Sequence, residues 1–141
     1  MSLDIHAVAR VAALECERQQ VDLHALSRLL AAYAFVYENQ DVELSIGHVI
    51  MLGSMVEPVK ARKFRITPVT FRNGGSSAPH DMIYELLEHR IEERDLTVEE
   101  FIKEFLWIHP FEDGNGRVAW ILQNWLNKTM DRPDTLKEYR W

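Results

Sequence analysis

The chain has 141 residues, of which 47% are hydrophobic and 27% are charged, and its formal net charge is −6 at pH 7. This length and this balance are typical of one soluble globular domain, and they exclude a mainly disordered or collagen-like chain. The acidic balance argues against nonspecific nucleic-acid binding, which needs a basic surface to neutralise phosphates.

Cysteine usage and the length of the apolar runs point to a cytoplasmic protein. The single cysteine, Cys16, cannot form an internal disulfide, and no cysteines or histidines occur at zinc-binding spacings. The first residues mix charged with apolar types, so they lack the uninterrupted core of a secretory signal. No apolar run is long enough to span a membrane. We therefore expect an intracellular protein that binds neither membrane nor nucleic acid.

Helical spacing of apolar residues predicts three helices in the N-terminal part. The range 3–18 fits a first helix. From Leu23 onward, apolar residues follow one another at intervals of three or four, which predicts a second helix. The stretch 43–54 repeats this period more weakly and predicts a short third helix.

A different pattern follows in residues 64–78. The first half is rich in β-branched and aromatic side chains, and a turn sequence occupies 73–77. This predicts a small β-hairpin. Pro68 has no backbone N–H, so its strand is expected at an exposed edge where another segment can pair with it. Basic side chains in and beside this segment are interpreted as solvated: Lys63, Arg65 and Arg72.

The C-terminal half has the clearest helical pattern. Apolar stripes predict helices around 83–91, 98–106 and 118–126. Thr97 and Glu100 form a capping-box pattern that sets the start of the second of these helices. The resulting prediction is an all-α, mainly helical fold with a small β-hairpin flap, in a single domain that covers 1–141.

The loop between the last two predicted helices reads HPFEDGNGR, from His109 to Arg117. Gly114 and Gly116 allow the backbone to bring N–H groups close to an anion at the start of the last helix. Arg117 adds a fork of donors for phosphate, and Asn115 can orient a phosphate oxygen. The loop therefore predicts a phosphate-binding site.

Other side chains of the loop suit group transfer at that site. Asp113 offers a hard oxygen ligand for Mg²⁺ beside a phosphate. His109 lies at the other end, where an imidazole can take a proton from an incoming hydroxyl. Phe111 is expected to point inward and anchor the loop, and Pro110 to end the preceding helix. Positioning and charge stabilisation would then provide most of the catalysis.

The run from His109 to Arg117 resembles the signature of the Fic family, H-P-F-x-(D or E)-G-N-G-R-x-x-R, at every specified position through Arg117. The similarity covers about residues 30–130, and residues 64–78 are similar to the flap hairpin of the family. The resemblance implies a Fic-type domain that uses ATP and Mg²⁺. The implied activity is protein adenylylation, the transfer of AMP to a serine, threonine or tyrosine hydroxyl of a target protein.

The resemblance also implies a role for individual residues. His109 corresponds to the catalytic base and Asp113 to the metal ligand. The nucleotide phosphates would be bound by Gly114, Asn115, Gly116 and Arg117. The flap would hold a target segment by edge-strand pairing, through Ile66, Thr67, Val69 and Thr70.

The chain departs from the signature at residue 120, where Trp120 replaces the second arginine. In similar proteins that arginine contacts the terminal phosphate or an inhibitory glutamate. Two alternatives to AMP transfer therefore stay open: phosphate transfer, as in Doc-type toxins, and nucleotide binding without turnover. Glu38, in a stretch that partly matches the inhibitory helix of the family, is a candidate inhibitory residue. An antitoxin chain or a second copy of the protein is a further candidate partner.

Overall fold

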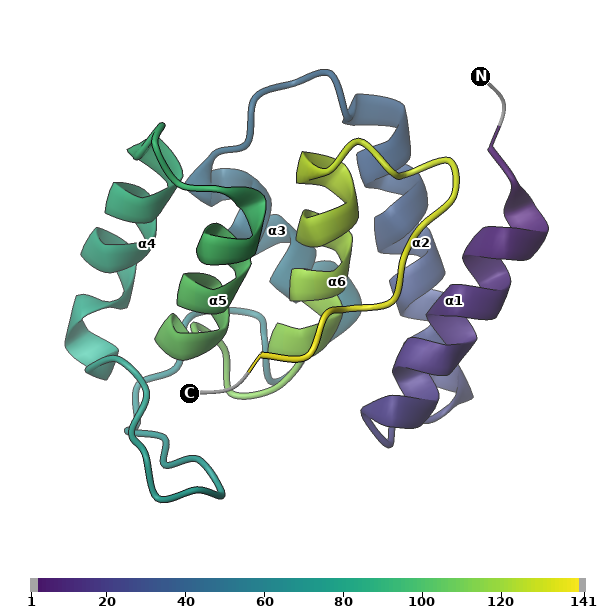
Figure 1. Cartoon of the computed structure of the whole chain (residues 1–141). Helices are drawn as coiled ribbons and strands as arrows, with labels where there is room; N and C mark the ends of the chain where they lie inside the picture. Colours follow the sequence, from purple (N-terminus) through teal and green to yellow (C-terminus); the bar gives the residue numbers. More distant parts are fainter. Residues whose placement is uncertain (1–2, 140–141) are drawn as a thin grey trace.

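The computed structural model describes residues 3–139, which form six α-helices and one short 3₁₀ helix and contain no β-strand. The predicted all-α fold is confirmed (Figure 1). No helix among these residues combines the length and the apolarity needed to cross a bilayer. In chain order the elements are α1 (Ile5–Arg18), α2 (Leu23–Asn39), α3 (Ile46–Val56), η1 (His80–Met82), α4 (Ile83–Glu92), α5 (Val98–Ile108) and α6 (Asn115–Leu126).

Side-chain caps explain where several helices begin. The carboxylates of Asp4 and Asp22 each accept a hydrogen bond from a backbone N–H in the first turn of α1 and α2. Thr97 does the same for α5, accepting from the Glu100 N–H at 3.1 Å, as its capping-box pattern predicts. At α3 the prediction began too early. Ser45 caps this helix, with its N–H donating to His48 Nδ1 at 2.9 Å, so the helix starts after Ser45.

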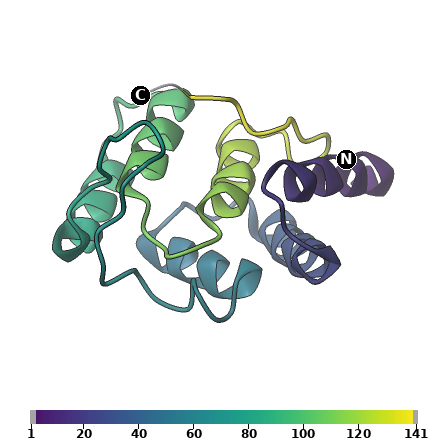
Figure 2. The same cartoon turned by 90° about the horizontal axis from the view of Figure 1, so that it is seen from below.

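Helix α6 lies at the centre of the fold (Figures 1 and 2). It contacts α1, α2, α3 and α5, and every residue from 117 to 125 is buried. Trp120 belongs to this buried stretch. Its ring stacks on Tyr33 with 5.1 Å between centroids, and its Nε1 donates to the Asp134 carbonyl at 2.7 Å. The residue that replaces the second signature arginine is therefore part of the core.

The chain brings several segments together at the N-terminal end of α6. In Figure 1 this is the lower end of the molecule, where α1 and α3 end, α2 begins, and the loop from His109 to Gly114 crosses. Figure 2 views this end directly. Segments that are distant from one another in the sequence therefore surround the predicted phosphate-binding loop.

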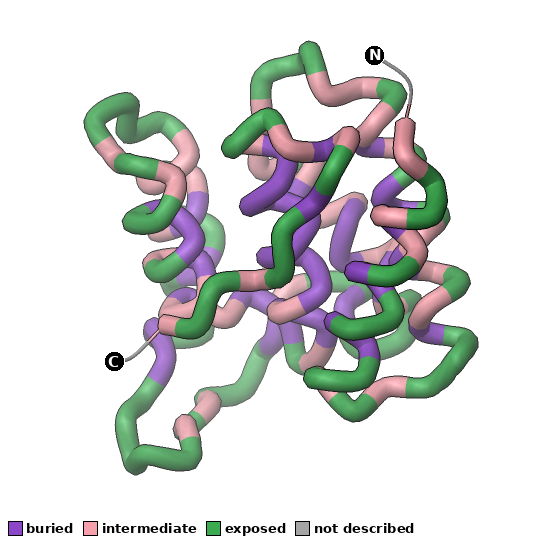
Figure 3. The backbone as a smooth tube through the Cα atoms, turned by 45° about the vertical axis from the view of Figure 1, so that its right-hand side comes forward, coloured by how far each residue is buried: buried purple, intermediate pink, exposed green. Residues whose placement is uncertain are grey.

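Residues 64–78 form a loop that projects from this same end and is mostly exposed (Figures 1 and 3). A single antiparallel bridge joins Thr70 to Ser76, and the Ser77 N–H donates to the Val69 carbonyl at 3.1 Å. The predicted β-hairpin is therefore not confirmed. Pro68 offers no donor for a ladder, and the Thr67 carbonyl accepts instead from the side chain of Arg65 at 2.7 Å. We call residues 64–78 the flap.

Candidate functional site

Two residues with a left-handed backbone conformation shape the loop between α5 and α6. His109 follows the last residue of α5 with φ 51° and ψ 62°, and Gly114 precedes α6 with φ 88°. Glycine adopts this conformation readily, but for another residue it costs on the order of 1 kcal/mol or more. The left-handed turn at His109 ends α5, as predicted from Pro110, and places the imidazole at the entrance of the loop.

Phe111 and Asn115 close the loop from inside. The Asn115 Oδ1 accepts from the Phe111 N–H at 2.9 Å, and its Nδ2 donates to the Phe111 carbonyl at 2.8 Å. The Phe111 ring is fully buried and lies 5.7 Å from the ring of Phe64, between centroids. Phe111 is thus the inward anchor that the sequence predicts. Asn115 holds the loop shape, and its predicted contact with a phosphate oxygen stays a prediction.

Arg117 is the most unusual side chain of the loop, because it is only 1% exposed yet incompletely hydrogen-bonded. Its Nη1 donates to the Val56 carbonyl at 3.3 Å, and its Nη2 lies 3.4 Å from Asp113 Oδ1 as an ion pair. Its Nε and Nη2 have no hydrogen-bond partner among the described residues. Leaving buried donors unpaired is costly, so an anion beside these atoms would be stabilising.

Side chains of the protein pack closely against both glycines at this end of α6. A Cβ atom on Gly114 would lie 3.3 Å from both Val56 Cγ2 and Glu57 Cβ, and one on Gly116 would lie 2.8 Å from Gln19 Oε1. The N–H groups of the first helical turn carry the positive end of the helix dipole. The start of α6, with Arg117 in its first turn, is therefore suited to an anion, and phosphate binding there stays a prediction.

The imidazole of His109 lies in a setting that favours its neutral form. Burial lowers the pKa of His109, and the positive charge of Arg65 lowers it further. A hydrogen bond with the backbone of Leu106 and the negative charge of Asp113 act in the opposite direction but are smaller effects. The edge of the ring also contacts Phe71 of the flap, with 5.5 Å between centroids. A neutral imidazole is the form that can accept a proton.

This lowered pKa predicts a shifted titration. Because burial and Arg65 both disfavour the imidazolium, His109 should take up its proton at a pH below the ordinary histidine value of about 6.5. An NMR titration of the histidine Cε1–H signals measures this, and the spectrum of His109→Asn assigns the signal. A midpoint at or above about 6.5 would contradict the described environment of the ring.

Arg65 corrects one sequence-based interpretation. It was expected to be solvated, but it is 4% exposed, because its guanidinium fills a site between the flap and the loop. It donates to the carbonyls of His109 at 2.6 Å and Ile108 at 3.0 Å on the loop side. On the flap side it donates to the Thr67 and Ala78 carbonyls and to Ser77 Oγ. Arg65 therefore links the flap to the histidine.

The flap residues predicted to bind a target lie beside the loop. The Arg65 N–H donates to the Pro110 carbonyl at 2.8 Å, which fixes the base of the flap at the entrance of the loop. Ile66 is 71% exposed, Thr67 and Thr70 are exposed, and Val69 is half-buried. An exposed isoleucine at this place is suited to a protein contact. Binding of a target by these four residues stays a prediction.

Asp113 is accessible at the same place, with 47% of its side chain exposed. Within residues 3–139 no group of three or more His, Cys, Asp or Glu side chains is arranged to hold a metal ion. Mg²⁺ is commonly held by one or two carboxylates together with phosphate oxygens and water. The accessible carboxylate of Asp113 thus fits an ion that arrives with a polyphosphate, and its role as a metal ligand stays a prediction.

The structure does not bring Glu38 to the loop. Glu38 is an exposed residue near the C-terminal end of α2, about 15 Å along the helix from Arg28, which contacts the end of α3 near the loop. The chain just beyond it lies at the other end of α6, where the Gln40 carbonyl accepts from Trp125 Nε1 at 2.9 Å. Glu38 therefore lies near the end of α6 opposite the loop, and its inhibitory role stays a prediction.

Close packing at Gly53 supports the anchor of the loop. A Cβ atom on Gly53 would lie 2.4 Å from Phe111 Cζ and 2.9 Å from the Ala61 carbonyl oxygen. Gly53→Ala is therefore expected to destabilise the protein by about 1–3 kcal/mol through overpacking. Urea unfolding measures the change. The control in the same helix is Gly47→Ala, where the nearest atom is Ser45 Oγ at 3.5 Å. The control should be neutral or stabilising, and equal effects of the two variants would contradict the described packing.

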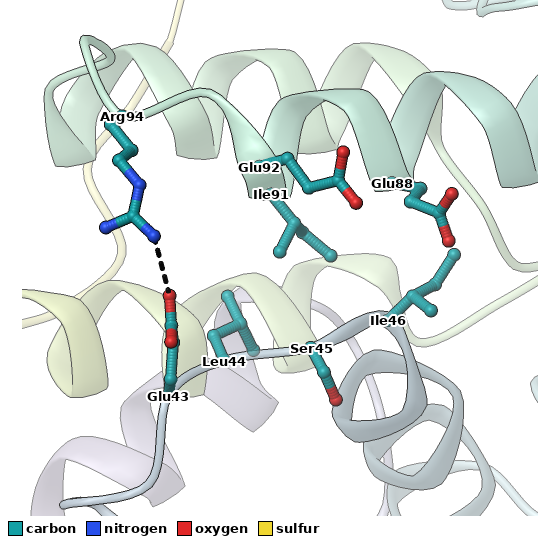
Figure 4. A pocket seen from close by; sticks show the side chains of 8 residues that line it. All are labelled: Glu43, Leu44, Ser45, Ile46, Glu88, Ile91, Glu92 and Arg94. Atoms are coloured by element: carbon teal, nitrogen blue, oxygen red, sulfur yellow. Dashed lines mark ion pairs between the residues drawn. The ribbon is translucent and has the colours of Figure 1, made fainter.

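A pocket of about 290 Å³ lies elsewhere, between the start of α3 and the end of α4 (Figure 4). Glu43, Glu88 and Glu92 make its lining acidic, and Arg94 pairs with Glu43 at 3.8 Å at one edge. None of its lining residues belongs to the loop or the flap. Its acidic lining is also unsuited to a nucleotide, so the 109–117 loop remains the candidate site.

Comparison with known proteins bears on the family of the chain. A protein-family model described as the Fic/DOC family matches residues 44–127. The matched range begins after α2 and contains the flap and the loop. A search of curated proteins finds no match. Since the family model matches more than half of the 141 residues, the chain belongs to the Fic/DOC family.

Proposed function

We propose that this protein is an adenylyltransferase, which moves AMP from ATP to a serine, threonine or tyrosine hydroxyl of a target protein. The observation that carries the proposal is the buried guanidinium of Arg117 at the start of α6, whose Nε and Nη2 have no hydrogen-bond partner among the described residues. An anionic phosphate would supply the missing acceptors. The histidine that begins the same loop is suited to activate a hydroxyl beside that phosphate.

The phosphates of ATP would be held by three neighbouring features of the loop. The N–H groups at the start of α6 offer donors, Gly114 turns the backbone into that helix with φ 88°, and Arg117 provides charge. Asp113 would hold Mg²⁺, which neutralises phosphate charge when it is bound. These residues would fix the position of the α-phosphorus before reaction, and positioning accounts for much of the rate in such transfers.

His109 would remove the proton during the transfer. The hydroxyl oxygen of the target forms a bond to the α-phosphorus, and the bond from that phosphorus to the oxygen bridging to the β-phosphate breaks. Pyrophosphate leaves, and the hydroxyl proton goes to the imidazole of His109. The lowered pKa of His109 keeps the imidazole neutral and ready for this step. The exposed Ile66 and its flap neighbours would position the target segment.

Label transfer tests this proposal. Purified protein is incubated with Mg²⁺, cell lysate and ATP labelled at the α-phosphorus, and protein-bound label is measured. We expect label on protein with the wild type, none with His109→Ala, and full labelling with His6→Ala, an exposed histidine on α1. Absence of label with the wild type would count against AMP transfer.

Phosphate transfer is a second candidate, because Trp120 is in the core and the signature therefore supplies one arginine instead of two. A nucleotide bound with its terminal phosphate beside His109 would transfer that phosphate. Label from the γ-phosphorus of ATP, without label from the α-phosphorus, would identify this reaction. Tight ATP binding with neither label transferred would identify a nucleotide-binding protein without turnover.

A further inference from the structure

Arg28, from a helix outside the range that matches the family, meets Arg117 at one oxygen atom. The Nε of Arg28 and the Nη1 of Arg117 both donate to the Val56 carbonyl, each at 3.3 Å. Arg28 lies in the first half of α2, and Val56 is the last residue of α3. Two guanidinium groups are thus held side by side at the end where the loop lies.

Capping of α3 accounts for only part of this arrangement. The last carbonyls of a helix lack partners and favour a nearby cation, so one arginine at Val56 is expected. A second guanidinium adds repulsion between like charges in a partly buried place. Two carboxylates oppose that repulsion: Asp113 pairs with Arg117 at 3.4 Å, and Asp22 interacts electrostatically with Arg28. Neither provides hydrogen bonds to the Nε and Nη2 of Arg117. A polyanion between the arginines would relieve the repulsion and accept these bonds.

We propose that Arg28 is a second phosphate-binding arginine, which contacts the phosphates beyond the α-phosphate of the bound nucleotide. This inference rests on the proposed function. It assigns to α2 a phosphate contact that α6, the helix containing Arg117, does not make. Residue 120 of α6 is a buried tryptophan that donates to the Asp134 carbonyl, so Arg117 is the one signature arginine that α6 offers to the phosphates. Arg28 would make ATP and ADP bind more tightly than AMP.

Calorimetry with Mg²⁺ and ATP, ADP or AMP tests this assignment. Arg28→Gln should weaken ATP and ADP binding at least about tenfold, because hydrogen bonds between charged groups are lost, and should leave AMP binding unchanged. Arg28→Lys should be intermediate, because it keeps the charge but loses the planar fork. Arg10→Gln, at an exposed position on α1, is the matched control and should bind all three nucleotides like the wild type.

The outcomes separate this inference from the proposed function. ATP binding by Arg28→Gln that equals the wild type, or an equal loss for ATP and AMP, overturns the role of Arg28. If Arg117→Gln loses ATP binding while Arg28→Gln keeps it, only the role of Arg28 is overturned. A wild type that binds no nucleotide overturns both. Arg28 also caps α3, so Arg28→Gln could fail to fold, and Arg28→Lys then serves as the test. Unchanged ATP affinity of Arg28→Lys overturns the proposal. Weakened ATP binding with unchanged AMP binding supports it.

Discussion

His109→Ala is expected to lower the rate of AMP transfer by about 100- to 10,000-fold, the usual contribution of a positioned general base. Its imidazole is the group at the loop entrance that is kept neutral by burial and by Arg65. The groups that we propose to bind phosphate lie at the other end of the loop, so ATP affinity should stay within about twofold of the wild type. Initial rates of label transfer and calorimetry measure the two quantities.

The control for this substitution is His6→Ala, which removes an exposed imidazole from α1. It should leave both the transfer rate and ATP affinity unchanged. Transfer by His109→Ala at more than about a tenth of the wild-type rate would show that another group accepts the proton, because a tenfold effect is too small for a lost general base.

Arg65→Met is expected to destabilise the protein by at least about 3 kcal/mol. The guanidinium serves the carbonyls of Thr67, Ala78, Ile108 and His109. Each buried acceptor left without a donor costs about 1–3 kcal/mol, and partial entry of water reduces the sum. The flap should also separate from the loop, because Arg65 joins them. Urea unfolding measures the free energy, and amide hydrogen exchange in the flap measures the separation.

Arg72→Met is the matched control, because Arg72 is an exposed arginine in the same flap. Its stability should stay within about 0.5 kcal/mol of the wild type. Similar stability of Arg65→Met and Arg72→Met would mean that the network around Arg65 contributes little, and the link between flap and histidine would then be wrong.

The helices were predictable because their signals are local. Apolar spacing places α4, α5 and α6, and the threonine at position 97 sets the start of α5 by hydrogen-bonding within one turn. The start of α3 was misplaced, because apolar residues before Ser45 continue the period although the helix begins at its cap. Local patterns therefore give the existence of helices more accurately than their ends.

The flap shows what a local pattern does not contain. Residues 64–71 have β-forming side chains, but a hairpin also needs hydrogen bonds between the backbones of its two strands. Here the Thr67 carbonyl is taken by Arg65, which itself reaches the loop more than forty positions later. Arg65, Arg72 and Lys63 look alike in sequence, and only the three-dimensional contact distinguishes the buried one. Its environment is a tertiary effect that overrides propensity.

Some residues of the candidate site can be recognised in the sequence, and others come near it only through the fold. The loop residues are recognisable because His109, Asp113, the glycines and Arg117 lie within nine consecutive positions. Gln19, which follows α1, lies close to Gly116, and Arg28 of α2 contacts Val56 at the end of α3. Both come near the loop only through the fold. Glu38 is a candidate inhibitory residue through a short sequence similarity, and this role stays a prediction. The N-terminal half of α2 contacts the end of α3 through Arg28, whereas the chain just after α2 contacts Trp125 near the C-terminal end of α6.

The most direct test of the central claim is a crystal structure with Mg²⁺ and a non-hydrolysable ATP analogue. The account predicts phosphate oxygens within hydrogen-bonding distance of the Arg117 Nε and Nη2 atoms, and the α-phosphorus as the phosphorus nearest to the imidazole of His109. A γ-phosphorus nearest to His109 would contradict AMP transfer. A nucleotide bound away from Gly114–Arg117 would contradict the assignment of the site itself.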